Sequence, residues 1–189
     1  MQQLWQLWNQ ALDPETVNKI IETSETYEPM EAKTGFDGDK SDNRIRSSEV
    51  RWLNPSAPNT QFIQEILWWH IRRSNRQAFG VEVSDIFDIQ YTKYHAEQDG
   101  HYNWHFDTFW ANDSMWDRKL SITIQLSDPK ENEGGEFIID PQYEQPNPDA
   151  LKSKGSIFVF PSPIRHKVTP VTKGTRKSLV AWVEGPKWK

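Results

Sequence analysis

Beyond Gly80 the chain is divided into short segments in which apolar and polar residues alternate, with glycines and prolines between them. The clearest is RKLSITIQLSD at residues 118–128, whose leucines and isoleucines fall on one face and whose Ser, Thr and Gln residues fall on the other. A period of two predicts a β-strand with one buried face. We expect further strands at 83–94, 99–107, 131–139, 155–162, 165–172 and 175–185.

Two helices are expected before this series of strands. In residues 11–27, Asp13 can cap the first turn and Pro14 suits its first position. Residues 59–80 form a second helix that Gly80 can end. Its predicted apolar stripe consists of Phe62, Ile63, Ile66, Leu67, Trp69 and Ile71.

The order of these elements predicts the fold class. Helices come first and a run of strands follows, so we expect a mainly β protein with flanking helices (α+β), an antiparallel sandwich or barrel with the helices outside. Residues 29–49 are polar and are predicted to be a loop. We expect one domain over residues 1–189, with a helical layer at about 10–80 and a β core at about 81–185.

The composition narrows the functional classes. Aromatic residues make up 13% of the chain and include ten tryptophans, enough to build one core. The net charge of −5 argues against a general nucleic-acid binder. There is no cysteine, hence no disulfide or thiolate metal site. With neither a secretory signal pattern nor a long apolar run, we expect a cytoplasmic protein without a membrane partner.

Three side chains form a candidate metal site. His105 and Asp107 are at positions i and i+2 of an expected strand, so both side chains point to the same face, whereas Trp104 and Phe106 should turn away into packing. His166 lies on a later strand and can supply the third ligand. Two imidazoles and one carboxylate are the set that holds a non-haem ferrous iron. The alternative is an accidental surface pair of His105 and Asp107.

Arg176, ten residues beyond His166, is the candidate anion-binding residue. A guanidinium is always charged and binds a carboxylate through two parallel hydrogen bonds. Ser178 lies on the same strand face and can add a hydroxyl donor, and Val180 and Trp182 continue that face. The alternative is an edge-strand arginine that faces water.

These residues resemble the motif of the iron(II)- and 2-oxoglutarate-dependent dioxygenases, in particular the prolyl 4-hydroxylase-like branch. The segment with Gly134, Gly135 and Glu136 is also similar to that family. The resemblance covers roughly residues 10–185, and its specific part is 91–182. It implies a double-stranded β-helix, or jelly roll.

The resemblance also implies the roles of the site residues. His105, Asp107 and His166 would ligate Fe(II), and Arg176 and Ser178 would meet the far carboxylate of 2-oxoglutarate. The implied reaction consumes dioxygen, releases succinate and carbon dioxide and hydroxylates an unactivated C–H bond. Ascorbate is a further cofactor that the resemblance suggests. Some relatives place a tyrosine near that carboxylate. Tyr94 is the best match here, and Tyr91 is its rival.

Several aromatic and basic residues are candidates for substrate contact. The segment 107–119 follows the metal motif and is a candidate lid, and 29–49 is a second one. For all of these residues, ordinary packing or a solvated surface is the competing interpretation. The candidates are Trp110, Met115 and Trp116 in the first segment, Arg44, Arg46 and Arg51 in and after the second, and Trp104, Phe106, Phe109, Trp110 and Trp182 as walls of a dry pocket.

The family analogy suggests a prolyl residue of a peptide or protein as the substrate. Two other functions remain open. An alkylated-nucleobase demethylase would share the metal and the co-substrate. Proteins of that kind carry an arginine-x5-arginine pattern on the last strand, whereas here Trp182 stands where the second arginine would follow Arg176. A non-enzymatic jelly-roll binding module would have no need of Arg176.

Overall fold

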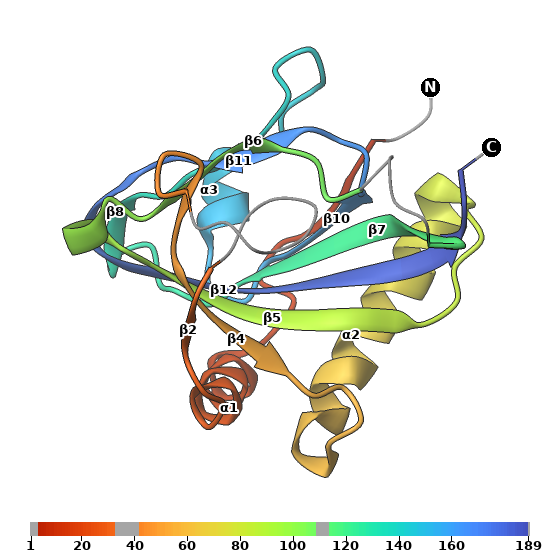
Figure 1. Ribbon diagram of the computed structural model, residues 1–189, viewed down its shortest axis with the longest axis horizontal. Coiled ribbons are helices and arrows are strands. Elements are labelled where there is room, and N and C mark those ends of the chain that lie inside the picture. The colour runs from red at the N-terminus through yellow and green to blue at the C-terminus, as the bar shows by residue number, and fades with distance from the viewer. Residues whose placement is uncertain (1–3, 33–41, 109–113, 189) are drawn as a thin grey trace.

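The computed structural model describes residues 4–32, 42–108 and 114–188 and contains two antiparallel sheets. The larger sheet has the strand order β1-β10-β7-β12-β5-β4-β2, with β8 also paired to β12, and the smaller sheet has the order β3-β6-β11-β9. The strands of the two sheets are β1 (Gln6–Trp8), β2 (Met30–Glu31), β3 (Arg46–Ser47), β4 (Glu49–Leu53), β5 (Ile86–His95), β6 (His101–His105), β7 (Trp116–Gln125), β8 (Asn132–Gly134), β9 (Phe137–Ile139), β10 (Ile157–Pro161), β11 (His166–Val168) and β12 (Val171–Pro186). The expected mainly β class with flanking helices is confirmed (Figure 1).

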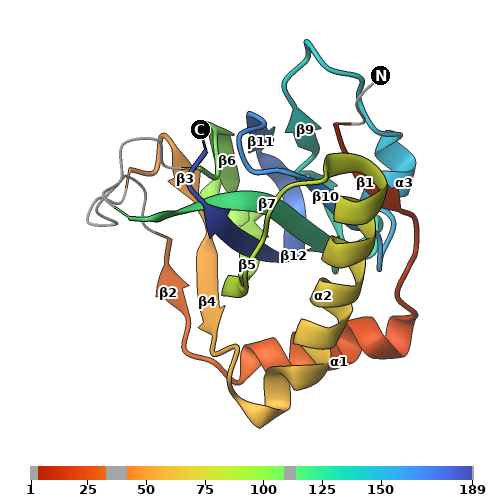
Figure 2. The same cartoon turned by 90° about the vertical axis from the view of Figure 1, so that its right-hand side faces the viewer.

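The helices α1 (Pro14–Glu25) and α2 (Gln61–Ser74) lie on the side of the larger sheet that faces away from the smaller sheet (Figure 2). Asp13 caps α1 as predicted, because its Oδ1 accepts from the backbone N–H of Thr16 at 2.8 Å. A π-helical turn follows α2, and Gly80 ends it with a φ of 64°. A third, short helix, α3 (Pro148–Lys152), lies between β9 and β10.

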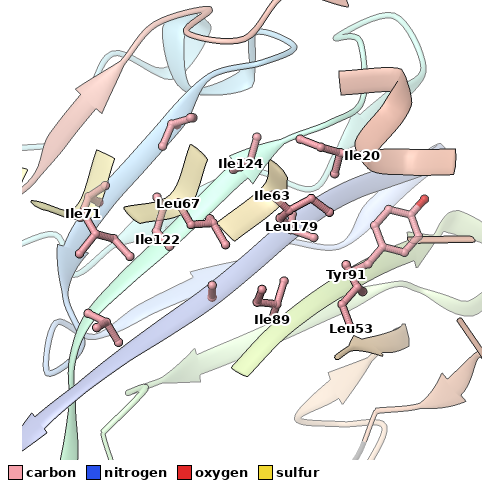
Figure 3. Packing of buried hydrophobic residues seen from close by; sticks show 14 of the residues in the cluster. Ile20, Leu53, Ile63, Leu67, Ile71, Ile89, Tyr91, Ile122, Ile124 and Leu179 are labelled. Carbon is pink, nitrogen blue, oxygen red and sulfur yellow. The ribbon is translucent and has the colours of Figure 1, made fainter. Parts of the chain in front are cut away.

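The main core lies between these two helices and the larger sheet (Figure 3). Leu67 and Ile63 of α2 pack there with residues of three central strands, among them Ile122, Leu179 and Ile89. The alternation predicted for β7 therefore has its physical cause: its isoleucines face the helices, and its polar residues face the smaller sheet.

One residue of the predicted helical stripe is placed differently. Trp69 is 52% exposed, so its assignment to the buried stripe was wrong. The buried positions of α2 include Ile63, Leu67 and Ile71 at a spacing of four, and His70 completes that face. Trp69 lies beside this stripe, where its ring packs edge-on against Trp8 with 5.5 Å between the ring centroids.

The N-terminal third of the chain is not only helical. It contributes β1 through β4, and the predicted loop at 29–49 contains β2, β3 and the first residue of β4. β1 pairs with β10 at one edge of the larger sheet, and β3 pairs with β6 in the smaller sheet. Strands of two or three residues are too short to show a period of two, so pairing with an existing strand edge decides them.

The long strand β12 lies in the middle of the larger sheet. It pairs with β5 on one side and β7 on the other, and its first residues pair with β8. The segments 165–172 and 175–185 were expected as two separate strands, but residues from Val171 onward belong to β12. Among the described residues, no helix has the length and apolar character needed to cross a membrane.

Candidate metal and carboxylate site

His105, Asp107 and His166 converge on one point between the sheets. His105 ends β6 and His166 begins β11, and the two residues are register partners in the smaller sheet. Asp107 lies two residues past the end of β6. One ligand atom from each of the three side chains lies within 4.8 Å of the others. The imidazole Nε2 atoms of His105 and His166 are 3.7 and 3.6 Å from the Asp107 carboxylate oxygens.

Backbone carbonyls orient both imidazoles. Nδ1 of His105 lies 2.8 Å from the carbonyl oxygen of Asn103, and Nδ1 of His166 lies 2.9 Å from that of Ile164. A carbonyl oxygen only accepts hydrogen bonds, so each Nδ1 carries the proton and donates it. In the neutral form of such an imidazole the lone pair is on Nε2, the ring nitrogen near Asp107, and this is the tautomer that a metal ligand requires.

Asp107 is fixed by neighbouring serines. Ser121 Oγ on β7 donates to Asp107 Oδ2 at 2.7 Å, and the Ser121 and Ser162 hydroxyls are 3.0 Å apart. The backbone N–H of Asp107 donates to the carbonyl of Ser162 at 3.1 Å. The carboxylate therefore receives a partner from the larger sheet, which ties the end of β6 to β7.

The charge states fit a divalent metal. Burial, and next the neighbouring His166, lower the pKa of His105 to about 3, so its imidazole is neutral at pH 7. Burial would raise the pKa of Asp107, but His166, His105 and the Ser121 hydrogen bond lower it on balance. An ionised carboxylate beside the neutral imidazole of His105 belongs to a donor set suited to ferrous iron.

Arg176 and Ser178 line the same pocket as these three residues. The pocket lies between the two sheets. Val180 and Trp182 also line it, so the predicted inward face of β12 is the pocket face. Arg176 is 5% exposed, and its Nη1 donates to Ser178 Oγ at 3.4 Å. Burial lowers the pKa of Arg176, but a guanidinium stays charged at neutral pH.

The structure separates the two tyrosine candidates. Tyr94 lines the pocket and is the register partner of Arg176, whose Cζ lies 5.6 Å from the centre of its ring. Tyr91 faces the opposite side of β5, in the main core, and its hydroxyl donates to Glu25 at 2.8 Å. Tyr94 therefore lies where a co-substrate contact is possible, and Tyr91 does not.

Some aromatic residues near the metal motif do not lie where we expected. Phe106 is 47% exposed and does not turn into packing. Trp104 is partly buried and lies under two cations, with Arg165 Cζ 5.0 Å and Lys167 Nζ 4.8 Å from its ring. Both residues alternate with His105 and turn away from it as expected, so neither is a wall of the pocket.

The candidate lid residues have varied surroundings. Met115 and Trp116 are 82% and 45% exposed, which is compatible with a lid. Phe109 and Trp110 lie outside the described residues. Arg44 is an exposed side chain that pairs with Asp42.

The two other arginines are held inside the protein. Arg51 pairs with Glu25 and Glu49 at 3.1 Å and does not reach the pocket. Arg46 is buried and lines the pocket, where its Nη2 donates to Gln90 Oε1 at 2.7 Å. The expectation of substrate contact is therefore compatible with the position of Arg46 only.

Sequence reasoning missed a stack of side chains beside His105. The Tyr102 and His105 rings are stacked with centroids 3.4 Å apart, and Arg46 lies over Tyr102 at 4.5 Å. Burial raises the pKa of Tyr102 to about 12, so its hydroxyl stays protonated. Tyr102 lies three residues before His105 on the same strand, β6, and in a regular strand two such side chains point to opposite faces. The register shift in the pairing of β6 with β11 between these two positions brings the rings to one side.

The sequence is similar to a known family of oxygenases and to hydroxylases of cyanobacteria. A family model described as the 2OG-Fe(II) oxygenase superfamily matches residues 89–184, which contain the three candidate metal ligands together with Tyr94, Arg176 and Ser178. The chain is 38% identical over 84 residues to a PKHD-type hydroxylase of Gloeothece citriformis, covering 44% of this chain and 37% of that protein. It is 29% identical over 134 residues to a PKHD-type hydroxylase of Crocosphaera subtropica, covering 69% and 58%. The chain thus matches less than two thirds of the length of these two relatives.

The fold has counterparts among solved structures. A prolyl hydroxylase from Trichoplax adhaerens, in complex with a hypoxia inducible factor oxygen degradation domain peptide fragment, matches with a TM-score of 0.72 and 15% identity. The match covers 95% of this chain and 82% of that one. At this identity the likeness shows the shared jelly-roll fold, which confirms the double-stranded β-helix implied by the sequence.

Proposed function

The chain belongs to the 2OG-Fe(II) oxygenase superfamily, and from this premise we propose that it is a dioxygenase that hydroxylates a prolyl residue of a peptide or protein. Membership of this superfamily implies Fe(II), 2-oxoglutarate and dioxygen as the reacting partners. One observation carries the proposal: three candidate metal ligands and a buried guanidinium line one pocket.

His105, Asp107 and His166 would hold the iron. Their hydrogen bonds to Asn103, Ser121 and Ile164 keep the donor atoms aimed at one point. Such partners around a metal site fix ligand orientation and raise affinity. Three protein ligands would leave other coordination positions for the co-substrate and dioxygen.

Arg176 would bind the far carboxylate of 2-oxoglutarate, with Ser178 and Tyr94 beside it. The guanidinium is buried and charged, and no carboxylate in the described parts of the chain lies within ion-pair distance of it. A buried charge without a partner is costly, so an anionic ligand is the natural complement. Two parallel hydrogen bonds from the guanidinium to the carboxylate would orient that ligand along the pocket.

When bound, iron would supply the oxidative decarboxylation of 2-oxoglutarate by dioxygen to succinate and carbon dioxide, in which one oxygen atom of dioxygen enters succinate and the other enters a C–H bond of the substrate. The residues of this chain bind and orient the reactants and keep water out. The apolar walls of the pocket serve that last task. They are formed by Phe137, Phe160, Val168, Val180 and Trp182.

The choice of a prolyl substrate is supported by the relatives. The Trichoplax protein is a prolyl hydroxylase with a bound peptide, and its jelly roll matches this chain over most of its length. A use of ascorbate, a cytoplasmic location and a single domain over residues 1–189 stay predictions.

The test measures succinate formation from 2-oxoglutarate under air with Fe(II), first alone and then with a panel of proline-containing peptides. We expect peptide-dependent succinate and a mass gain of one oxygen on proline. The control is the same panel with each proline replaced by alanine. Stimulation by alkylated DNA instead of by any peptide would reject the prolyl substrate, and the lack of any 2-oxoglutarate turnover would reject the dioxygenase itself.

A further inference from the structure

Arg176 stands between two hollows. It lines the front pocket that contains the candidate metal ligands, and it also lines a second hollow of about 250 Å³. Gln125, Asn132, Gly135 and Lys152 line this second hollow, which we call the rear hollow. A smaller neighbouring hollow of about 20 Å³, room for about one water molecule, shares Arg176, Gln125, Gly135 and Lys152 with it. The Arg176 side chain therefore borders both the front pocket and the rear hollow.

The protein holds the Arg176 guanidinium loosely. In the described part of the chain its one hydrogen bond is the 3.4 Å contact to Ser178 Oγ, and its contact with Tyr94 is a ring contact at 5.6 Å. A guanidinium has five N–H donors, and most of these have no protein acceptor here. Nothing among the described residues therefore fixes the guanidinium against the front pocket.

The rear hollow offers one buried acceptor that has no hydrogen-bond partner. Asn132 Oδ1 is buried and has no hydrogen-bond partner, while Asn132 Nδ2 donates to the carbonyl of Gly134 at 3.0 Å. The Glu136 carboxylate lines the smaller neighbouring hollow, where it accepts from Lys152 at 2.9 Å. A buried acceptor without a donor is costly, so a guanidinium that moves back toward Asn132 relieves that cost.

Gly135 leaves room for such a movement. A Cβ atom at Gly135 would lie 2.9 Å from Cδ of Arg176 and 2.9 Å from Val171 Cγ2, closer than real Cβ contacts. The missing side chain therefore creates the space in which the Arg176 stem runs. The φ of Gly135 is 67°, so the backbone also favours glycine.

We propose that Arg176 is a movable end wall of the co-substrate pocket, so that the pocket accepts 2-oxoadipate as well as 2-oxoglutarate. 2-Oxoadipate is longer by one methylene, and withdrawal of Arg176 toward Asn132 makes room for it while the carboxylate–guanidinium pair is kept. Asn132 and Gly135 are then specificity-determining residues. This inference rests on the proposed function, because it takes the front pocket as the site of the 2-oxo acid.

The experiment compares the dissociation constants of the two acids by anaerobic calorimetry on the full chain loaded with Mn(II). A rigid pocket discriminates against one extra methylene by about 10–200-fold. A movable end wall predicts less than about 10-fold discrimination between 2-oxoglutarate and 2-oxoadipate.

A variant that fills the rear hollow provides the second readout. Lys152 lies on α3 with 42% of its side chain exposed, so it tolerates a larger residue. Lys152→Trp should weaken 2-oxoadipate by at least about 10-fold and leave 2-oxoglutarate unchanged. Lys152→Met is the matched control, since it removes the same charge without filling the space, and it should leave both affinities unchanged.

The outcomes separate this inference from the proposed function. Tight 2-oxoglutarate binding with 2-oxoadipate weaker by more than about 10-fold overturns the movable wall alone. Equal weakening of both acids in Lys152→Trp overturns it too. If neither acid binds the metal-loaded protein, the proposed function falls together with this inference.

Discussion

His105 and His166 lie directly opposite each other on two adjacent antiparallel strands, with their ring centroids 4.1 Å apart. Register pairing therefore sets the separation of two candidate ligands that are far apart in the sequence. Asp107, two residues beyond the end of β6, is the third candidate ligand, and a hydrogen bond from Ser121 orients its carboxylate. The candidate ligands lie at the end of the smaller sheet, while the larger sheet supplies Arg176, the residue proposed to bind the carboxylate of the co-substrate.

Replacement of His166 by alanine should abolish iron binding and turnover. It removes one of the three donor atoms, and losing even an outer partner of a metal ligand typically costs about 10–100-fold in affinity. Anaerobic titration with Fe(II) checks the result. Lys167→Ala is the control, since this side chain lies on the opposite face, over Trp104. Stoichiometric iron binding by His166→Ala would refute the ligand assignment.

Replacement of Arg176 by alanine should weaken 2-oxoglutarate by about 2–5 kcal/mol, the scale for removing one partner of a buried hydrogen-bonded charge pair. Calorimetry on the metal-loaded protein measures it. Lys177→Ala is the matched control, because Lys177 lies next in sequence but pairs with Glu131 instead of lining the pocket. An unchanged affinity in Arg176→Ala would mean that another cation binds the co-substrate.

Ser121→Ala tests the support of Asp107. Loss of the 2.7 Å hydrogen bond should lower metal affinity by about 10–100-fold without removing a ligand. Competition with a metal chelator gives the measurement. Ser84→Ala serves as the control, because its hydroxyl donates to the carbonyl of Glu184, away from the site. If both variants bind metal equally well, Ser121 has no role in orienting Asp107.

Leu67→Ala should destabilise the fold by about 2–5 kcal/mol, the usual cost of such a truncation in a core. Leu67 is fully buried between α2 and the larger sheet. Urea unfolding measures the change. Glu65→Ala on the exposed side of the same helix should stay within about 0.5 kcal/mol. A similar small effect in Leu67→Ala would argue against this packing of α2.

Acid should weaken the contact between α1 and the larger sheet. Burial would raise the pKa of Glu25, but hydrogen bonds from Lys93 and Tyr91 lower it on balance. A folded-state pKa below the unfolded value means stability that is present above about pH 4.5 and is lost as the pH falls through the folded pKa. Glu25 is about one-third exposed, so we expect an effect of about 0.2–1 kcal/mol.

Urea midpoints of the wild type and Glu25→Gln between pH 7 and pH 3 check this. The variant keeps an acceptor for the Tyr91 hydroxyl but loses the charge, so it should be less stable at pH 7 and converge with the wild type in acid. Glu22→Gln on the exposed side of α1 is the control. Parallel curves for wild type and Glu25→Gln would contradict the expectation.

Local chemistry was readable from the chain without its structure. The Asp13 cap, the alternation in β7 and the common side of Arg176 and Ser178 each depend on residues within a few positions of one another. Such features follow from backbone geometry and hold whatever the rest of the fold does. Thus the types of the candidate ligands and the face of β12 were predictable.

The tertiary structure alone decided which of these residues meet. Pairing of β6 with β11 brings His105 to His166, and pairing of β12 with β5 selects Tyr94 over Tyr91. The short strands β1 to β4, the exposure of Trp69 and the hollow behind Arg176 were equally out of reach. Strand pairing joins residues far apart in the chain, and its register depends on how the two sheets and the helices pack, information that no single segment contains.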